Sequence, residues 1–178
     1  GYAYNYQLAI SLDAVDEIRS YVENGGGYIG ICAGAYFASK TVAWEGGVYP
    51  YELGLFDGTA YGSLNYVAPW PSYVMTDITL NQNNEISKGN ADKISVLYYG
   101  GPILTPNPGV EVDTIATWNS ADNTPAIINF DFGKNSIIIS VTSKMLWPQF
   151  SLKNCHKCRA VSISTRQTLN YYLPKNLN

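Results

Sequence analysis

The chain has 178 residues, of which 46% are hydrophobic and 14% charged, and its formal net charge is −3 at pH 7. This length and hydrophobic content fit a single domain over residues 1–178 with a sizeable core. No apolar run approaches the roughly 18 residues that a membrane-spanning helix needs. The few Lys and Arg residues are scattered along the chain, so we expect neither a membrane nor a nucleic acid as a partner.

The first predicted element is a helix that follows Ser11, a residue type that caps helices. Its apolar positions recur on one face, at Leu12, Val15, Ile18 and Val22. Asn24 and Gly25 are typical of a helix end, so the helix is expected to end there.

The next segment, residues 25–39, has the sequence GGGYIGICAGAYFAS and predicts a strand, a sharp turn and a helix. The apolar run Tyr28–Cys32 is typical of a strand buried on both faces, and Ala33–Ser39 is the helix that follows. Gly30 and Gly34 bracket Cys32, as expected where a strand turns so sharply that neighbouring Cβ atoms would clash. The pattern therefore predicts a nucleophile elbow with a thiol at its tip.

Such an elbow has direct chemical implications for Cys32. The turn holds the central side chain in a strained backbone conformation, and the Ala33 N–H points toward whatever the thiol attacks. A helix N-terminus also lowers the pKa of a thiol. The alternative is that Cys32 is a small buried hydrophobe, because unoxidised cysteine is among the most buried residue types.

The rest of the chain predicts mostly sheet. Trp44–Pro71 is rich in Gly, Tyr and Pro, which predicts irregular loops with one short strand near Leu64–Val67. Further strands are predicted at Tyr73–Leu80, Lys93–Tyr99, Val110–Trp118, Pro125–Phe130 and Ser136–Thr142. Phe132 to Asn135 predicts a hairpin turn, and Ser164–Leu173 a final helix.

Tyrosine is abundant, and many of the 15 residues stand beside Gly, Pro or Asn. These are Tyr49, Tyr51, Tyr61, Tyr66, Tyr73, Tyr98 and Tyr99. Amphipathic rings in loops are compatible with a binding cleft, and equally with half-buried positions in a sheet.

Five segments together carry a family resemblance: GGGYIGICAGAYFAS, YELGLFDGTAYG, VLYYGGPIL, GVEVDTIATW and PAIINFDFGKNSIIIS. In order and spacing they resemble the biotin-protein ligase N-terminal-like family of the class I glutamine amidotransferase-like superfamily. The resemblance covers residues 10–141. It implies a flavodoxin-like α/β fold, a three-layer sandwich. The adenylate-forming GRGRxG-type motif, a P-loop and a GxGxxG motif after a strand are absent, so no cofactor is expected.

The chain departs from that family at its start. The first βαβ unit of the family precedes a Pro-Gly-Gly loop, and this chain begins at about that loop, so we expect it to lack that unit. An incomplete sheet would expose apolar edges, so we expect another segment, a second copy or a partner chain to complete it. The missing loop also carries half of the oxyanion hole in related enzymes.

A second departure concerns the general base. Related amidotransferases place a His and then a Glu after the strand that corresponds to residues 136–141, where this chain has Thr142 and Lys144. The single histidine is His156, between Cys155 and Cys158. A CxxC pair is half of a zinc site, and no second pair of ligands is evident, so no metal is expected.

His156 is therefore a weak candidate for the base, and Glu45 and Glu52 are weak candidates for carboxylates near Cys32. The three cysteines are too few for a disulfide scaffold, which favours a reducing, cytoplasmic compartment, although a leader removed before Gly1 would leave the same sequence.

Two functions are compatible with these residues. In the first, Cys32 is the nucleophile of a thiol-dependent hydrolase or amidotransferase that acts on an amide or related carbonyl, with the Ala33 N–H as oxyanion donor. In the second, the chain binds a small molecule without turnover, because the His-Glu pair is absent. In both, the predicted small-molecule pocket includes Gly30, Gly34, Tyr98, Tyr99, Gly100 and Gly101.

Overall fold

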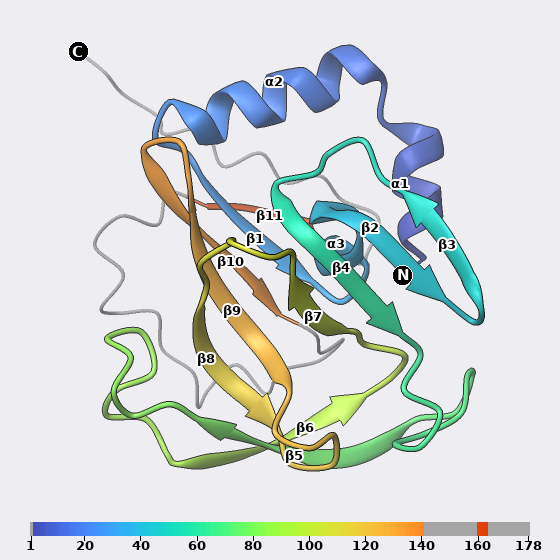
Figure 1. Cartoon of the computed structure of the whole chain (residues 1–178), viewed down its shortest axis with the longest axis vertical. Helices are drawn as coiled ribbons and strands as arrows, with labels where there is room; N and C mark the ends of the chain where they lie inside the picture. Colours follow the sequence, from blue (N-terminus) through green and yellow to red (C-terminus); the bar gives the residue numbers. More distant parts are fainter. Residues whose placement is uncertain (1, 141–159, 164–178) are drawn as a thin grey trace.

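The computed structural model describes residues 2–140 and 160–163, which form an α/β fold with two sheets (Figure 1). The helices are α1 (Ala3–Ala9), α2 (Leu12–Glu23) and α3 (Ala33–Ala38). The strands of the larger sheet are β1 (Gly27–Ile31), β5 (Val74–Leu80), β6 (Lys93–Tyr98), β8 (Asp113–Trp118), β9 (Pro125–Phe132), β10 (Asn135–Ser140) and β11 (Ala160–Ile163). Those of the smaller sheet are β2 (Ser39–Trp44), β3 (Gly47–Pro50), β4 (Phe56–Gly62) and β7 (Ile103–Pro106).

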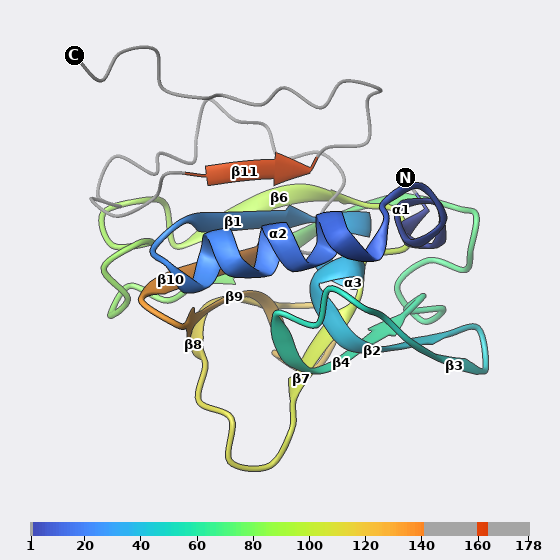
Figure 2. The same cartoon turned by 90° about the horizontal axis from the view of Figure 1, so that it is seen from above.

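The larger sheet is mixed, with the strand order β11-β1-β10-β9-β8-β5-β6. β1 pairs in parallel with both β10 and β11, and the remaining neighbours are antiparallel. The smaller sheet has the order β3-β2-β4-β7. Helix α3 contacts β1 and β10 of one sheet and β2 and β4 of the other, and Figure 2 shows it between them. The segment that carries Cys32 therefore joins the two sheets.

The predicted first helix is confirmed as α2. The side chain of Ser11 accepts a hydrogen bond from the N–H of Ala14 at 3.3 Å, and the helix ends at Glu23 with Asn24 as its C-cap. Val15 and Val22 are buried as predicted. Leu12 is 64% exposed, so its place on the buried face was wrong, because the first residue of the helix lies beyond the edge of the core.

The predicted strands of the second half are present as β5, β6, β8, β9 and β10. The predicted hairpin turn is also confirmed, since Phe132 pairs with Asn135 across the end of β9 and β10. The prediction for Ser164–Leu173 lies outside the described residues. Helix α1 and strands β7 and β11 were not predicted.

The prediction of irregular loops over Trp44–Pro71 was wrong for β3 and β4, which are strands of the smaller sheet. The glycines that suggested loops occupy places of close contact: a Cβ on Gly58 would lie 2.5 Å from the Thr105 carbonyl oxygen. The strand predicted near Leu64–Val67 is a turn. Its Leu64 N–H donates to the hydroxyl of Tyr98.

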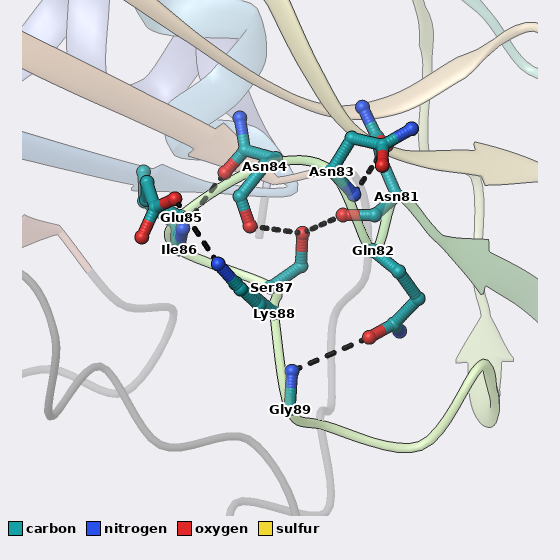
Figure 3. A network of polar contacts seen from close by, with 9 residues as sticks. All are labelled: Asn81, Gln82, Asn83, Asn84, Glu85, Ile86, Ser87, Lys88 and Gly89. Carbon is teal, nitrogen blue, oxygen red and sulfur yellow. Dashed lines mark hydrogen bonds and ion pairs between the residues drawn. The ribbon is translucent and has the colours of Figure 1, made fainter.

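The segment between β5 and β6 contains an asparagine-rich loop, residues 81–89, that satisfies its own polar groups (Figure 3). Side-chain oxygens of Asn81, Gln82 and Asn84 accept hydrogen bonds from backbone N–H groups of the loop at 3.1, 3.3 and 2.8 Å. The Ser87 hydroxyl donates to the Asn81 carbonyl at 2.6 Å. These bonds are local turn motifs, so they account for the shape of the loop without a ligand.

The contact between Gly30 and Gly34 predicts the effect of a substitution. A Cβ at position 30 would lie 2.7 Å from the Gly34 carbonyl oxygen and 2.8 Å from the Tyr28 ring. Because backbone cannot yield easily, we expect Gly30→Ala to lower the free energy of unfolding by about 3 kcal/mol in urea denaturation. The control Gly109→Ala meets no atom within 4 Å and carries only the cost of its positive φ, about 1 kcal/mol. Equal losses in the two variants would contradict this account.

Candidate functional site

Cys32 lies at the turn between β1 and α3 in a backbone conformation that L residues seldom adopt. Its φ is 51° and its ψ is −106°. Its carbonyl accepts hydrogen bonds from the N–H groups of Ala35 and Tyr36 at 2.9 and 3.1 Å, which begin the helix. The close approach of Gly30 to Gly34 makes this sharp turn possible. The surrounding structure therefore holds the cysteine in a strained conformation.

Burial dominates the electrostatics of the Cys32 thiol. The residue is 4% exposed, and desolvation raises the pKa of its thiol above the usual value. A hydrogen bond from the Ala33 N–H opposes this shift. The N–H that opens α3 thus lowers the pKa, as expected, but desolvation is the larger effect and the net shift is upward. The resting group is a neutral thiol.

Three phenols lie close enough to this thiol to interact with it. Proximity to Cys32 contributes to a raised pKa at Tyr6, Tyr36 and Tyr98, after desolvation in each case. Within the described residues, the buried Tyr6 hydroxyl has no hydrogen-bond partner. These tyrosines are neutral, and none of them is a base at neutral pH.

Cys32 lines a cavity of about 370 Å³ whose wall is largely aromatic. The lining residues are Tyr2, Ala3, Tyr4, Cys32, Tyr36, Val42, Trp44, Tyr49, Tyr51, Trp70, Tyr99 and Gly100. They come from the N-terminus and α1, from the smaller sheet, and from the segments on either side of β5 and β6. We call this space the aromatic cavity. Its volume is in the usual range of small-molecule sites.

The rings of the aromatic cavity pack against one another in a chain. Tyr36 meets Trp44 with ring centroids 5.5 Å apart, and Trp44 meets Trp70 at 5.4 Å, both edge to face. The Trp70 ring in turn packs against the Tyr99 ring, with centroids 4.9 Å apart. The Tyr36 hydroxyl donates to the Gly100 carbonyl at 2.9 Å, which ties the helix of Cys32 to the opposite wall.

Only some of the residues predicted for the pocket line the aromatic cavity. Tyr99 and Gly100 line the aromatic cavity. Tyr98 is fully buried, with its ring against Trp118, and Gly101 is buried outside the lining. Gly30 and Gly34 shape the turn, and the Gly34 carbonyl accepts the buried hydroxyl of Tyr28 at 2.8 Å.

The candidate carboxylates, Glu45 and Glu52, do not line the cavity. Glu52 is exposed and outside the lining. The Glu45 carboxylate accepts hydrogen bonds from the N–H and hydroxyl of Ser63, which lower its pKa. The predictions for His156, Cys155, Cys158, Thr142 and Lys144 lie outside the described residues. Among the residues that the structure describes, no group of three His, Cys, Asp or Glu side chains could hold a metal.

Sequence reasoning missed much of the cavity wall. Tyr2, Tyr4 and Trp44 were not singled out, and only the unusual number of tyrosines pointed to an aromatic site. Of the tyrosines that were noted, Tyr49, Tyr51 and Tyr99 line the cavity, whereas Tyr61, Tyr66 and Tyr73 do not. In the described part of the chain, none of the helices is long and apolar enough to cross a bilayer.

Comparison with protein families gives one match to nearly the whole chain. The model described as "Biotin-protein ligase, N terminal" matches residues 1–170. A search of curated proteins finds no match.

Solved structures give matches at low identity. A glutamine amidotransferase is similar with a TM-score of 0.51 and 18% identity over 72% of this chain and 58% of that chain. A thua-like protein from Bacteroides uniformis has a TM-score of 0.51 and 15% identity over 72% and 54% of the two chains. A beta-galactosidase from Bacillus circulans sp. alkalophilus has a TM-score of 0.50 and 14% identity over 72% and 18%. This chain thus spans little more than half of the amidotransferase, and the likeness shows the fold alone.

The raised thiol pKa predicts how Cys32 alkylation depends on pH. We expect iodoacetamide to label Cys32 slowly at pH 7 and its rate to rise with an inflection above about 8.5, the usual cysteine value. The same protein labelled in denaturant provides the control. Peptide mass spectrometry locates the modified residue, and an inflection well below 8.5 would contradict the neutral resting thiol.

The raised pKa of the Cys32 thiol also predicts how the stability of the fold depends on pH. Because the folded pKa is raised, the buried thiol stabilises the fold fully below the unfolded pKa of about 8.5, and this contribution is lost as the pH rises through the folded pKa.

The bond between Tyr36 and Gly100 gives a further prediction. Tyr36→Phe leaves a buried carbonyl without its donor, so we expect the free energy of unfolding to fall by about 1–3 kcal/mol in urea denaturation. The control Tyr61→Phe changes a tyrosine that is 48% exposed and should stay within about 0.5 kcal/mol of the parent. A similar loss in both variants would mean that the bond contributes nothing specific.

Proposed function

We propose the following function for this chain, which belongs to the biotin-protein ligase N-terminal family: it is a glutamine amidotransferase-like domain whose Cys32 attacks an amide or related carbonyl compound. The observation that carries this proposal is the backbone of Cys32, with φ at 51° on the wall of the aromatic cavity. A cysteine needed only for packing has no reason to occupy a strained turn. The likeness of fold to a glutamine amidotransferase supports amide chemistry by analogy alone.

The chemistry proceeds in two steps. In the first, the Cys32 sulfur bonds to the carbonyl carbon while the π electrons move to the oxygen, which accepts a hydrogen bond from the Ala33 N–H. The C–N bond then breaks, and the amine leaves with the proton of the thiol. In the second step a water oxygen bonds to the acyl carbon, the C–S bond breaks and the sulfur regains a proton.

The Ala33 N–H already donates to the Cys32 sulfur, so it lies beside the atom that attacks. It is the natural first donor to an oxyanion that forms at that sulfur.

Proton transfer is the step for which the described residues offer least support. The cavity lining contains no acid or base apart from tyrosines and the thiol itself. The resting thiol is neutral, so its proton has to leave as the sulfur attacks. Glu52 does not face this path in the structure, and His156 lies outside the described residues, so the base remains to be identified by mutation.

The same observation favours a second candidate function. A neutral, buried thiol close to phenols is typical of an unreactive cysteine. In this alternative the aromatic cavity binds a small molecule for a regulatory purpose and turns nothing over.

A trapping experiment decides between the two candidates. The protein is incubated with a panel of amides and activated esters, and the intact mass and released product are measured. We expect an acyl adduct on Cys32 and product release that Cys32→Ala lowers at least 100-fold. The double variant Cys155→Ser and Cys158→Ser controls for the other two thiols and should retain activity.

Binding without an adduct and without product release would overturn catalysis at Cys32 and favour the regulatory function. Product release that Cys32→Ala leaves unchanged would overturn catalysis at Cys32 as well, and would assign the reaction to other residues. His156→Ala and Glu52→Ala in the same assay test the two weak candidates for the base.

A further inference from the structure

Among the residues that the structure describes, none that lines the aromatic cavity has a charged side chain. None of its 12 lining residues is Asp, Glu, Lys, Arg or His. The nearby Glu45 carboxylate is engaged by Ser63, and Lys40 pairs with Asp57 at 3.2 Å. An amino acid such as glutamine carries an ammonium and a carboxylate, and burying either group without a partner is costly. The described lining side chains therefore offer a zwitterion no counter-charge.

The size of the cavity fits a ring together with a short polar group. A cavity of about 150 Å³ lined by apolar side chains is enough for benzene. The aromatic cavity has about 370 Å³, which leaves room for an amide or ester beside a ring.

Exposure divides the cavity into a rim and a floor. Trp70, Tyr2 and Tyr4 are 41–53% exposed, whereas Cys32 and Tyr36 are only 4–5% exposed. A substrate whose carbonyl reaches the sulfur therefore places its other end among the rings near the rim. Trp70 at the rim already packs edge to face against Trp44, and Trp44 against Tyr36 of the floor, with interplanar angles of 75° and 84°. A further ring can continue this arrangement, which is favourable for aromatic groups.

We propose that the aromatic cavity selects uncharged carbonyl compounds that carry an aromatic ring, with the ring against Trp44, Trp70 and Tyr99 and the carbonyl at Cys32. This inference rests on the proposed function, because that function places the carbonyl of the bound compound at Cys32. Aromatic rings also bind quaternary ammonium ions through cation–π contacts, so tetramethylammonium is the competing ligand that the test has to exclude.

Binding to Cys32→Ala, which cannot form an adduct, tests the inference separately from catalysis. The probes are 3-phenylpropanamide, its cyclohexyl analogue, glutamine and tetramethylammonium, measured by isothermal titration calorimetry. Protection of the wild-type Cys32 from iodoacetamide provides a second readout on the unmodified protein. We expect the aromatic amide to bind at least tenfold more tightly than each of the other three probes.

Variants of the rim identify the rings that bind. Trp70→Ala and Tyr99→Ala should each weaken the aromatic amide about tenfold, since tenfold corresponds to about 1.4 kcal/mol and aromatic contacts contribute on this order. Trp70→Phe and Tyr99→Phe keep a ring and should restore most of the affinity. Tyr61→Ala removes an exposed tyrosine outside the cavity and should leave binding unchanged.

The outcomes distinguish this inference from the proposed catalysis. Tight binding of the aromatic amide with neither an adduct nor released product on the wild-type protein supports the inference and overturns the catalysis. Equal or tighter binding of glutamine, tetramethylammonium or the cyclohexyl analogue overturns the inference, as does absence of binding by all four probes. An adduct from glutamine with no affinity for the aromatic amide would likewise overturn it while supporting the catalysis.

Discussion

The contact between the backbones of Gly30 and Gly34 is the constraint on which the site depends. It lets β1 turn into α3 without a spacer, and the turn places Cys32 at φ 51°. Because α3 contacts strands of both sheets, the same turn fixes the smaller sheet relative to the larger one. The aromatic cavity takes part of its wall from that smaller sheet. The contact between these two glycine backbones therefore positions both the Cys32 sulfur and much of the cavity wall around it.

The sequence was most informative where local chemistry determines local structure. The Ser11 cap, the Asn24 end of α2 and the turn after Phe132 follow from residue types that prefer those positions, and the structure has them there. It was least informative for the smaller sheet. Gly58 was taken for a loop residue, although it fits a strand whose neighbour, Thr105, comes within 2.5 Å of its missing Cβ. That contact spans 47 residues of sequence, so no local pattern reveals it.

The candidate site was also predictable only in part. Its cysteine was visible from the glycines beside it, but its wall was not, since the wall combines residues from the N-terminus with others near position 100. The loop Tyr98 to Gly101 shows the difficulty at the scale of single residues. Tyr99 lines the cavity and Tyr98 belongs to the core, because successive side chains near the end of a strand point to opposite sides. The sequence identified the motif, but it did not predict the direction of each side chain.

The burial of Cys32 also bears on how long the site can keep its chemistry. Peroxides and soluble disulfides react with exposed thiolates, and this sulfur is 4% exposed and protonated at rest. Oxidative damage should therefore reach it slowly, even while the site stands empty. A reagent meant to modify it has to fit between tyrosine and tryptophan rings first, so the cavity acts as a filter on every electrophile that approaches the sulfur. The aromatic wall thus protects the thiol as well as offering a surface for a ligand.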